Sequence, residues 1–176
     1  MKKSLIIGRF QPFHLGHLAA LKLIDSRGPD EIIIGIGLVP EPDTRNPWSP
    51  LDVMRMISSS LEGELQTTRI KMVVMPDIGN PPKYAEHVEK LTGASECNTT
   101  LFTGNFVTKK CFQSEEFNRH YRVVDFRELG MHHQFGVSGS RIRTLIILND
   151  DTWKTLVPRG TREFIEKRGY PQGERG

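Results

Sequence analysis

The sequence predicts an α/β fold: a five-stranded parallel sheet with helices on both faces, followed by a short C-terminal helical segment. Short apolar, β-branched runs alternate with helix-period stretches, which is typical of βαβ units. Two of the runs, Ile32–Ile36 and Ile70–Met75, read as apolar runs without alternation, as expected of parallel strands buried on both faces. The length of 176 residues suits one such domain with a small appendage.

Each expected strand is a run of apolar residues bounded by turn residues or charges. The third run ends at Pro76, which has no N–H and cannot continue a central strand. In chain order, the expected strands are Leu5–Ile7, Ile32–Ile36, Ile70–Met75, Thr100–Phe102 and Val123–Val124.

Helices are expected between and after these strands, because apolar residues recur there three or four positions apart. The clearest helix follows Ser49, a favourable N-cap residue, and has Pro50 at its first position. In chain order, the expected helices are Leu15–Ile24, Pro50–Leu61, Tyr84–Leu91, Thr108–Phe117, Ser140–Leu148 and Thr161–Lys167. We expect residues 1–150 to form the main domain, 151–170 a helical segment packed on it, and 171–176 a flexible tail.

The composition is that of an ordinary globular protein, with 37% hydrophobic and 26% charged residues. The net charge of +3 suits a small anionic ligand better than a long nucleic acid, so no nucleic-acid partner is expected. Cys97 and Cys111 form no CxxC pair and are expected to be reduced thiols. The apolar runs are too short for a signal peptide or a membrane span, which predicts a cytoplasmic protein without a membrane partner.

The segment after the first strand reads Gly-Arg-Phe-Gln-Pro-Phe-His-Leu-Gly-His and opens the first helix. Backbone amides at a helix N-terminus favour an anion, and Gly8 and Gly16 let the chain and a ligand approach closely. His14 and His17 are three residues apart and share one helix face, where two imidazoles can hold the oxygens of a polyphosphate. The segment therefore predicts a phosphate site.

Other interpretations of the two histidines stay open at this point. They can be helix-surface residues without a role. They can also be half of a zinc site, which would need a third ligand from His87, His120, His132 or His133. A Walker P-loop is excluded, because no Gly-Lys-Ser/Thr follows.

A second candidate phosphate site begins at Val137 and reads Val-Ser-Gly-Ser-Arg-Ile-Arg. Ser138 or Ser140 can cap the following helix, and Arg143 can bind two phosphate oxygens over the same helix end. An ordinary helix cap with a surface arginine is the alternative. Two such turns at opposite ends of the chain favour one nucleotide lying across the switch point of a parallel sheet.

Both segments carry a family resemblance. The string from Gly8 to His17 contains the His-x-Gly-His motif of the nucleotidyltransferase superfamily and resembles the archaeal type of nicotinamide-nucleotide adenylyltransferase. The string from Val137 to Arg143 resembles the superfamily's Ile-Ser-Ser-Thr-x-x-Arg motif. The resemblance implies a Rossmann-like fold and the transfer of AMP from ATP to nicotinamide mononucleotide, with Mg²⁺ and without a covalent intermediate. It also implies a homo-oligomer, such as a hexamer.

The resemblance also implies roles for particular residues, and no metal ligand from the protein. The catalytic residues would be His17, His14 and Arg143. The ATP-binding residues would be Gly8, Arg9, Phe10, Gln11, Gly16, Ser138, Gly139, Ser140 and Arg141. The mononucleotide-binding residues would be Asp77, Tyr84, Gly104 and Asn105.

The chain departs from the family pattern at two places, where it has Tyr84 instead of a tryptophan and Asp52-Val53 instead of a Glu-Arg pair. Transfer to another phosphate acceptor (phosphopantetheine, flavin mononucleotide or glycerol phosphate) and a nucleotide sensor without turnover therefore stay as alternatives. A nucleic-acid-binding module would rest on the mild positive charge alone. The loop Asp125–Val137 is the candidate lid.

Overall fold

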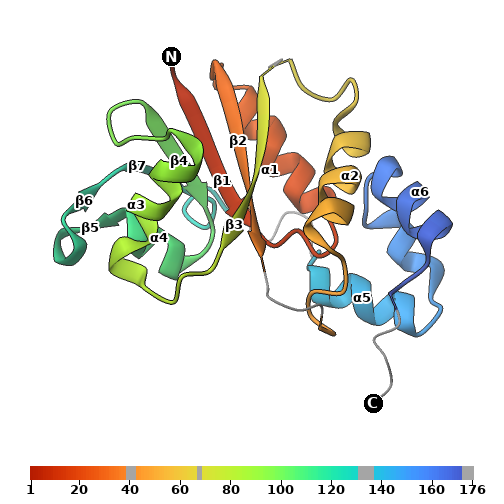
Figure 1. Ribbon diagram of the computed structural model, residues 1–176. Coiled ribbons are helices and arrows are strands. Elements are labelled where there is room, and N and C mark those ends of the chain that lie inside the picture. The colour runs from red at the N-terminus through yellow and green to blue at the C-terminus, as the bar shows by residue number, and fades with distance from the viewer. Residues whose placement is uncertain (39–42, 67–68, 131–136, 172–176) are drawn as a thin grey trace.

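The computed structural model describes residues 1–38, 43–66, 69–130 and 137–171. Its centre is a sheet of five parallel strands in the order β3-β2-β1-β4-β7 (Figure 1), which confirms the expected fold class. The strands are β1 (Lys3–Gly8), β2 (Glu31–Leu38), β3 (Ile70–Pro76), β4 (Thr99–Thr103) and β7 (Arg122–Asp125).

Helices cover both faces of the sheet (Figure 1). Successive side chains of a strand point to opposite faces, so Leu5 and Ile33 join one apolar cluster while Ile6 and Ile34 join the other. Helices α1, α2, α5 and α6 pack in the cluster that contains Ile6, and α3 and α4 pack in the cluster that contains Leu5. The helices are α1 (Leu15–Asp25), α2 (Pro50–Leu61), α3 (Pro81–Thr92), α4 (Phe106–Phe112), α5 (Gly139–Ile147) and α6 (Arg159–Arg168).

The helix expected over Thr108–Phe117 is shorter than predicted, because α4 ends at Phe112. The chain then forms a small antiparallel pair, β5 (Gln113–Ser114) with β6 (Arg119–His120), around the 3₁₀ turn η1 (Glu115–Phe117). Asn118 reverses the chain there with a φ of 51°, a left-handed conformation that asparagine tolerates. Apolar periodicity continues into this hairpin, so the sequence alone does not mark the end of the helix.

Two further details differ from expectation. Strand β3 lies at the edge of the sheet and is mostly half-buried, whereas the sequence predicted burial on both faces. Helix α3 begins at Pro81, three residues before the expected start, because Asn80 caps it by accepting a hydrogen bond from the Lys83 N–H. Among the described residues, no helix is both long and apolar enough to cross a bilayer.

The strand order predicts which edge of the sheet is suited to a ligand. From β1 the chain winds outward through β2 and β3, and it then returns to the other side of β1 to form β4 and β7. The segments that leave the carboxyl ends of β1 and β4 diverge, and in open α/β sheets ligands bind in the resulting crevice. Gly8 and Thr103 are the last residues of these two strands.

The C-terminal helical segment packs against α2. It comprises the 3₁₀ turn η3 (Asp151–Thr155) and α6, which lies beside α2 in Figure 1. A Cβ at Gly160 would stand 2.4 Å from the main-chain carbon of Ser59, so only glycine permits this closeness. Thr161 N donates to Ser60 Oγ at 3.0 Å in the same contact. The expected tail after Pro171 lies outside the described residues.

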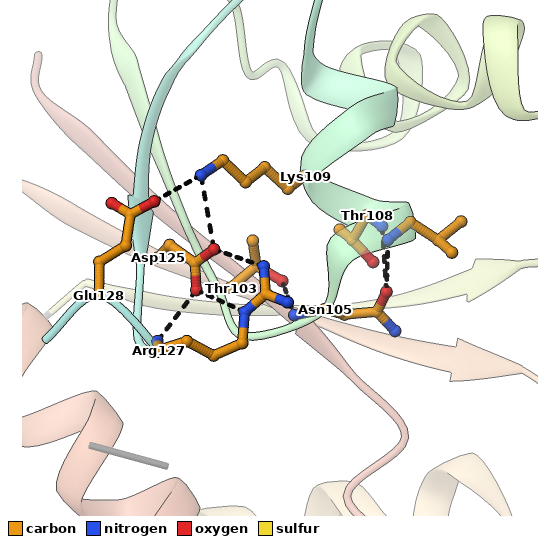
Figure 2. Close-up of polar contacts among 8 residues, drawn as sticks. Thr103, Asn105, Thr108, Lys109, Asp125, Arg127 and Glu128 are labelled. Carbon is orange, nitrogen blue, oxygen red and sulfur yellow. Dashed lines mark hydrogen bonds and ion pairs between the residues drawn. The ribbon is translucent and has the colours of Figure 1, made fainter. Parts of the chain in front are cut away.

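A buried carboxylate ties the last strand of the sheet to α4 (Figure 2). Asp125 ends β7 with its side chain 2% exposed, and Arg127 donates to both of its oxygens, at 3.0 and 2.6 Å. Lys109 of α4 lies 3.5 Å from Asp125 and 2.8 Å from Glu128. The Arg127 guanidinium, as the largest influence, holds the pKa of Asp125 well below its usual range.

We predict that Asp125→Asn destabilises the protein in a pH-dependent way. The pKa of Asp125 is lower in the folded than in the unfolded chain, so its stabilisation is present above an ordinary aspartate pKa of about 4 and is lost as the pH falls further. Near neutral pH the variant should lose about 1–3 kcal/mol, as expected for hydrogen bonds to a charged group. Urea unfolding of both proteins at neutral and acidic pH measures the difference.

Asp151→Asn is the matched control, since this carboxylate is 79% exposed and pairs with Lys154. It should change the free energy of unfolding by less than about 0.5 kcal/mol. A stability difference between wild type and Asp125→Asn that stays constant down to acidic pH would contradict the prediction.

Candidate active site

The turn after β1 is held in an unusual conformation. Phe10 has a φ of 52°, in the left-handed region, although it is not glycine, and its side chain is buried. A Cβ at Gly8 would lie only 3.1 Å from the Phe10 ring, so the ring fills the space beside the end of the strand. Such strained residues persist where the surrounding packing over-determines them, and they cluster at functional sites.

The turn delivers His14 to the N-cap position of α1. His17 N donates to His14 Nδ1 at 3.4 Å, and His14 N donates to His17 Nδ1 at 3.3 Å, so the two residues cap the helix reciprocally. Their rings stack with centroids 3.6 Å apart, and Phe10 and Phe13 pack on the ring of His17. Because each Nδ1 accepts a hydrogen bond, each neutral imidazole carries its proton on Nε2 and can donate it.

Both histidines are neutral in the free protein near pH 7. Burial lowers the pKa of His14 to about 4. Burial is also the main cause that lowers the pKa of His17, and the neighbouring His14 adds to the shift. The pair therefore offers two adjacent N–H donors without the repulsion of two stacked cations.

The N-terminal end of α5, which is distant in the sequence, packs against the turn after β1. Ser138 is the N-cap, and its Oγ accepts from Arg141 N at 3.2 Å. A Cβ at Gly139 would stand 2.5 Å from the main-chain oxygen of Gln11. Arg143 donates to that same oxygen at 2.6 Å and to the carbonyl of Thr44 at 3.1 Å. Only glycine allows this approach, which fixes the arginine beside the histidines.

These elements enclose a cationic pocket of about 540 Å³. Arg9, Arg45 and Arg143 supply its positive charge, and the two neutral histidines supply donors. A concave surface with several cations and helix N-termini suits a polyphosphate. The lining residues are Arg9, Phe10, Gln11, His14, His17, Arg45, Gly139, Ser140 and Arg143.

Sequence reasoning missed Arg45 as a site residue. It lies in the loop 38–49, outside the two segments that carry the family motifs. The loop is ordered near it, since Asp43 Oδ1 accepts from both Arg45 N and Asn46 N. A cation beside an Asx-type turn in a long loop is the signal that could have indicated it.

A second cavity, of about 560 Å³, lies on the side of the sheet that α3 and α4 cover, and Arg9 lines both cavities. The Tyr84 ring is half-buried and packs edge-on to Phe112 at 6.3 Å. The residues that line this cavity are Ile7, Gly8, Arg9, Gly37, Leu38, Met75, Asp77, Gly79, Asn80, Pro81, Tyr84, Asn105, Val107, Thr108 and Cys111.

Asn105 is oriented by its own helix. Its Oδ1 accepts from Val107 N at 2.8 Å and Thr108 N at 3.2 Å, and its backbone N–H donates to Thr103 Oγ1 (Figure 2). This arrangement occupies the amide oxygen. The side-chain NH₂ group is left as the donor that Asn105 can offer to a ligand.

The structure gathers most of the expected site residues into these two cavities, but four do not line either one. Gly16 lies under the His14 ring, which a Cβ would meet at 3.1 Å. Ser138 caps α5, Arg141 is exposed, and Gly104 is exposed after β4.

The zinc interpretation gains no support from the part of the chain that the structure describes, where no three His, Cys, Asp or Glu side chains form a cluster suited to a metal. His87 lies on α3 and His120 on β6, away from the pair at α1. His132 and His133, like residues 131–136 of the candidate lid in general, lie outside the described residues.

Comparisons with known proteins agree with this architecture. A family model described as cytidylyltransferase-like matches residues 5–145. Nicotinamide-nucleotide adenylyltransferase of Pyrococcus furiosus is 32% identical over 170 residues, which is 95% of this chain and 84% of that protein. The protein of the same name from Methanococcus aeolicus is also 32% identical, over 94% of this chain and 88% of its own length.

Solved structures share the fold. A bifunctional NMN adenylyltransferase/ADP ribose pyrophosphatase of Francisella tularensis, complexed with AMP and a manganese ion, superposes with a TM-score of 0.66 at 22% identity. The match covers 94% of this chain, which spans about half (48%) of that protein. Nicotinic acid mononucleotide adenylyltransferase of Plasmodium falciparum, complexed with NaAD, has a TM-score of 0.60 at 13% identity over 95% of this chain and 96% of its own.

The family model covers most of the chain, and the two relatives named above, each 32% identical, cover 94–95% of it. The chain therefore belongs to the cytidylyltransferase-like family, among the nicotinamide-nucleotide adenylyltransferases.

Proposed function

We propose that this protein transfers AMP from ATP to nicotinamide mononucleotide and releases NAD and pyrophosphate. The observation that carries the proposal is a pair of cavities that share Arg9 at the switch point of the sheet. One is cationic and suits a triphosphate, and the other has an aromatic wall and amide donors that suit a pyridine nucleotide. The family membership agrees with this division, since its relatives are named for this reaction.

The chemistry is a direct in-line displacement. A phosphate oxygen of the mononucleotide attacks the α-phosphorus of ATP, a new P–O bond forms, and the bond from the α-phosphorus to the bridging oxygen breaks as pyrophosphate leaves. The reaction needs positioning and charge stabilisation more than a covalent intermediate. Burial raises the pKa of the Cys111 thiol, so this residue in the second cavity is not an activated nucleophile.

The histidine pair and the arginines have different electrostatic roles. His17 and His14 donate from Nε2 to the phosphate oxygens on which charge accumulates in the transition state. Arg143, held by two backbone carbonyls, binds the triphosphate and the leaving pyrophosphate. Arg9, at the wall between the cavities, can contact the phosphates of both substrates.

The divalent cation enters as part of the MgATP substrate. Among the described residues, the cationic pocket contributes arginines, histidines and hydroxyls but no carboxylate ligands to its lining. Mg²⁺ commonly keeps most of its water ligands and binds through substrate phosphates, which fits such a pocket. The manganese ion in the Francisella tularensis structure supports the use of a divalent metal.

The second cavity suits the neutral amide of nicotinamide mononucleotide. Tyr84 offers a ring face for stacking on the pyridine, and Asn105 offers an amide donor. Among the described lining residues, Asp77 is the carboxylate, and Arg9 at the shared wall is the cation. The Asp77 carboxylate beside Tyr84 would repel a carboxylate on the pyridine ring, whereas a neutral amide meets no such repulsion.

We predict that His17→Ala lowers kcat for NAD formation by about two orders of magnitude or more, because it removes a donor to the developing charge. The assay mixes purified protein with ATP, Mg²⁺ and nicotinamide mononucleotide and measures NAD. His120→Ala, a half-exposed histidine side chain on β6, is the control and should retain full turnover. Near-normal turnover in His17→Ala would overturn the role, and no NAD from the wild type would overturn the function.

We predict that both imidazoles carry their proton on Nε2 in the free protein. Nitrogen NMR of labelled histidines should show the Nε2–H form near neutral pH, with protonation of His14 near pH 4. MgATP should raise both pKa values, because the polyphosphate charge favours the protonated ring. An Nδ1–H form or an ordinary pKa in the free protein would contradict this assignment.

We predict that Gly139→Ala weakens MgATP binding by about tenfold, because its Cβ would overlap the Gln11 carbonyl that holds Arg143. Titration calorimetry with MgATP measures the effect. Thr144→Ala, on the exposed side of the same helix, is the control and should bind as the wild type does. Unchanged affinity in a folded Gly139→Ala protein would show that the close approach is not required.

A further inference from the structure

Tyr170, which follows α6, contacts a tryptophan beside the phosphate pocket. Its half-buried ring meets the ring of Trp48 edge-on, with centroids 5.4 Å apart and planes at 83°. Trp48 is 1% exposed and lies between the loop 43–46 and α2. Edge-to-face contact of this kind fixes the orientation of both rings. The mechanism above assigns no role to either residue.

Trp48 is joined to the phosphate pocket through Gln11. The Gln11 side chain donates to the Trp48 carbonyl at 2.7 Å and accepts from the Trp48 N–H at 3.1 Å, so it holds that backbone at two points. The main-chain oxygen of Gln11 accepts from Arg143 Nη1 at 2.6 Å. Gln11 and Arg143 both line the pocket. A continuous series of contacts therefore runs from Tyr170 through Trp48 and Gln11 to Arg143.

The ring of Tyr170, rather than its hydroxyl, carries this contact. Within the described part of the chain, neither the buried hydroxyl oxygen of Tyr170 nor the buried Trp48 Nε1 has a hydrogen-bond partner. A hydroxyl without a partner adds no hydrogen bond to the stability of its surroundings. Burial raises the pKa of the Tyr170 phenol, and the positive charge of Arg143 opposes that rise.

We propose that Tyr170 is a positioning residue for the ATP half-site: its ring holds Trp48, which keeps Gln11 and Arg143 in the geometry that binds the triphosphate. The inference rests on the proposed function, since it takes the cationic pocket to be the ATP site. The inference assigns a role to a residue that follows α6. Tyr170 does not line the pocket and lies outside the two phosphate-binding segments.

The test compares Tyr170→Leu with Tyr170→Phe. We expect Tyr170→Leu to raise the KM for ATP and the Kd for MgATP by about fivefold or more, with the KM for nicotinamide mononucleotide within about twofold of wild type. Tyr170→Phe keeps the ring and should restore both values to within about twofold of wild type. Steady-state kinetics give the KM values, and calorimetry with MgATP and no acceptor gives the Kd.

Ile165→Ala is the matched control for a loss of stability. Ile165 is 3% exposed in α6, on the same face of the sheet, so its truncation should lower the melting temperature. It should leave the KM for ATP unchanged, because it is not part of the contact series. A Tyr170→Leu protein that only melts earlier, like the control, would overturn the proposal.

A double variant tests the route. If Tyr170 acts through Gln11, adding Tyr170→Leu to Gln11→Ala should leave the Kd for MgATP close to that of Gln11→Ala alone. If the fold-changes of the two single variants in the Kd for MgATP instead multiply in the double variant, Tyr170 does not act through Gln11.

Failure of the proposed function is distinguishable from failure of this inference. If the wild type binds MgATP but forms no NAD, the function fails and the Kd comparison still tests Tyr170. If the wild type forms NAD and Tyr170→Leu binds MgATP as tightly as it does, the inference alone fails.

Discussion

The contact between the start of α5 and the turn after β1 is the constraint on which the rest of the site depends. It joins segments near opposite ends of the chain, through the Gly139 approach and the Arg143 hydrogen bond to the Gln11 carbonyl. Without it the cationic pocket would lack one wall and one of its three arginines. The strand order makes the contact possible, because the chain returns to the sheet beside β1 after it has left through β3.

The electrostatics of the pocket follow from that geometry. The two histidines cap α1 reciprocally, with His14 buried and His17 partly buried, so desolvation keeps both rings neutral and leaves the Nε2–H groups as donors. Fixed positive charge comes instead from arginines, whose guanidinium groups stay protonated. Donors and cations are in place before a ligand arrives, so little reorganisation is needed when charge develops at a phosphate. The second cavity, by contrast, has an aromatic wall, and the two share a boundary at Arg9.

Much of the fold and part of the site could be predicted from local sequence. The strand–helix alternation and the cap before Pro50 were sufficient for the fold class and for the bounds of α2. His14 and His17 were expected on one face, and their rings stack. The helix over Thr108–Phe117 was wrong in its second half, because the hairpin after Phe112 depends on strand pairing that apolar periodicity does not encode.

The sequence by itself determined the alternation of strands and helices and the two candidate phosphate-binding segments, because each depends on residues a few positions apart. Only the tertiary structure decided which distant side chains join them. Arg45 enters the pocket from a loop, and Tyr170 approaches it through Trp48. Asp125 is held at the edge of the sheet by Arg127 and by Lys109 of α4. The physical reason is that most of these contacts join residues with no fixed spacing along the chain, so local pattern cannot predict them.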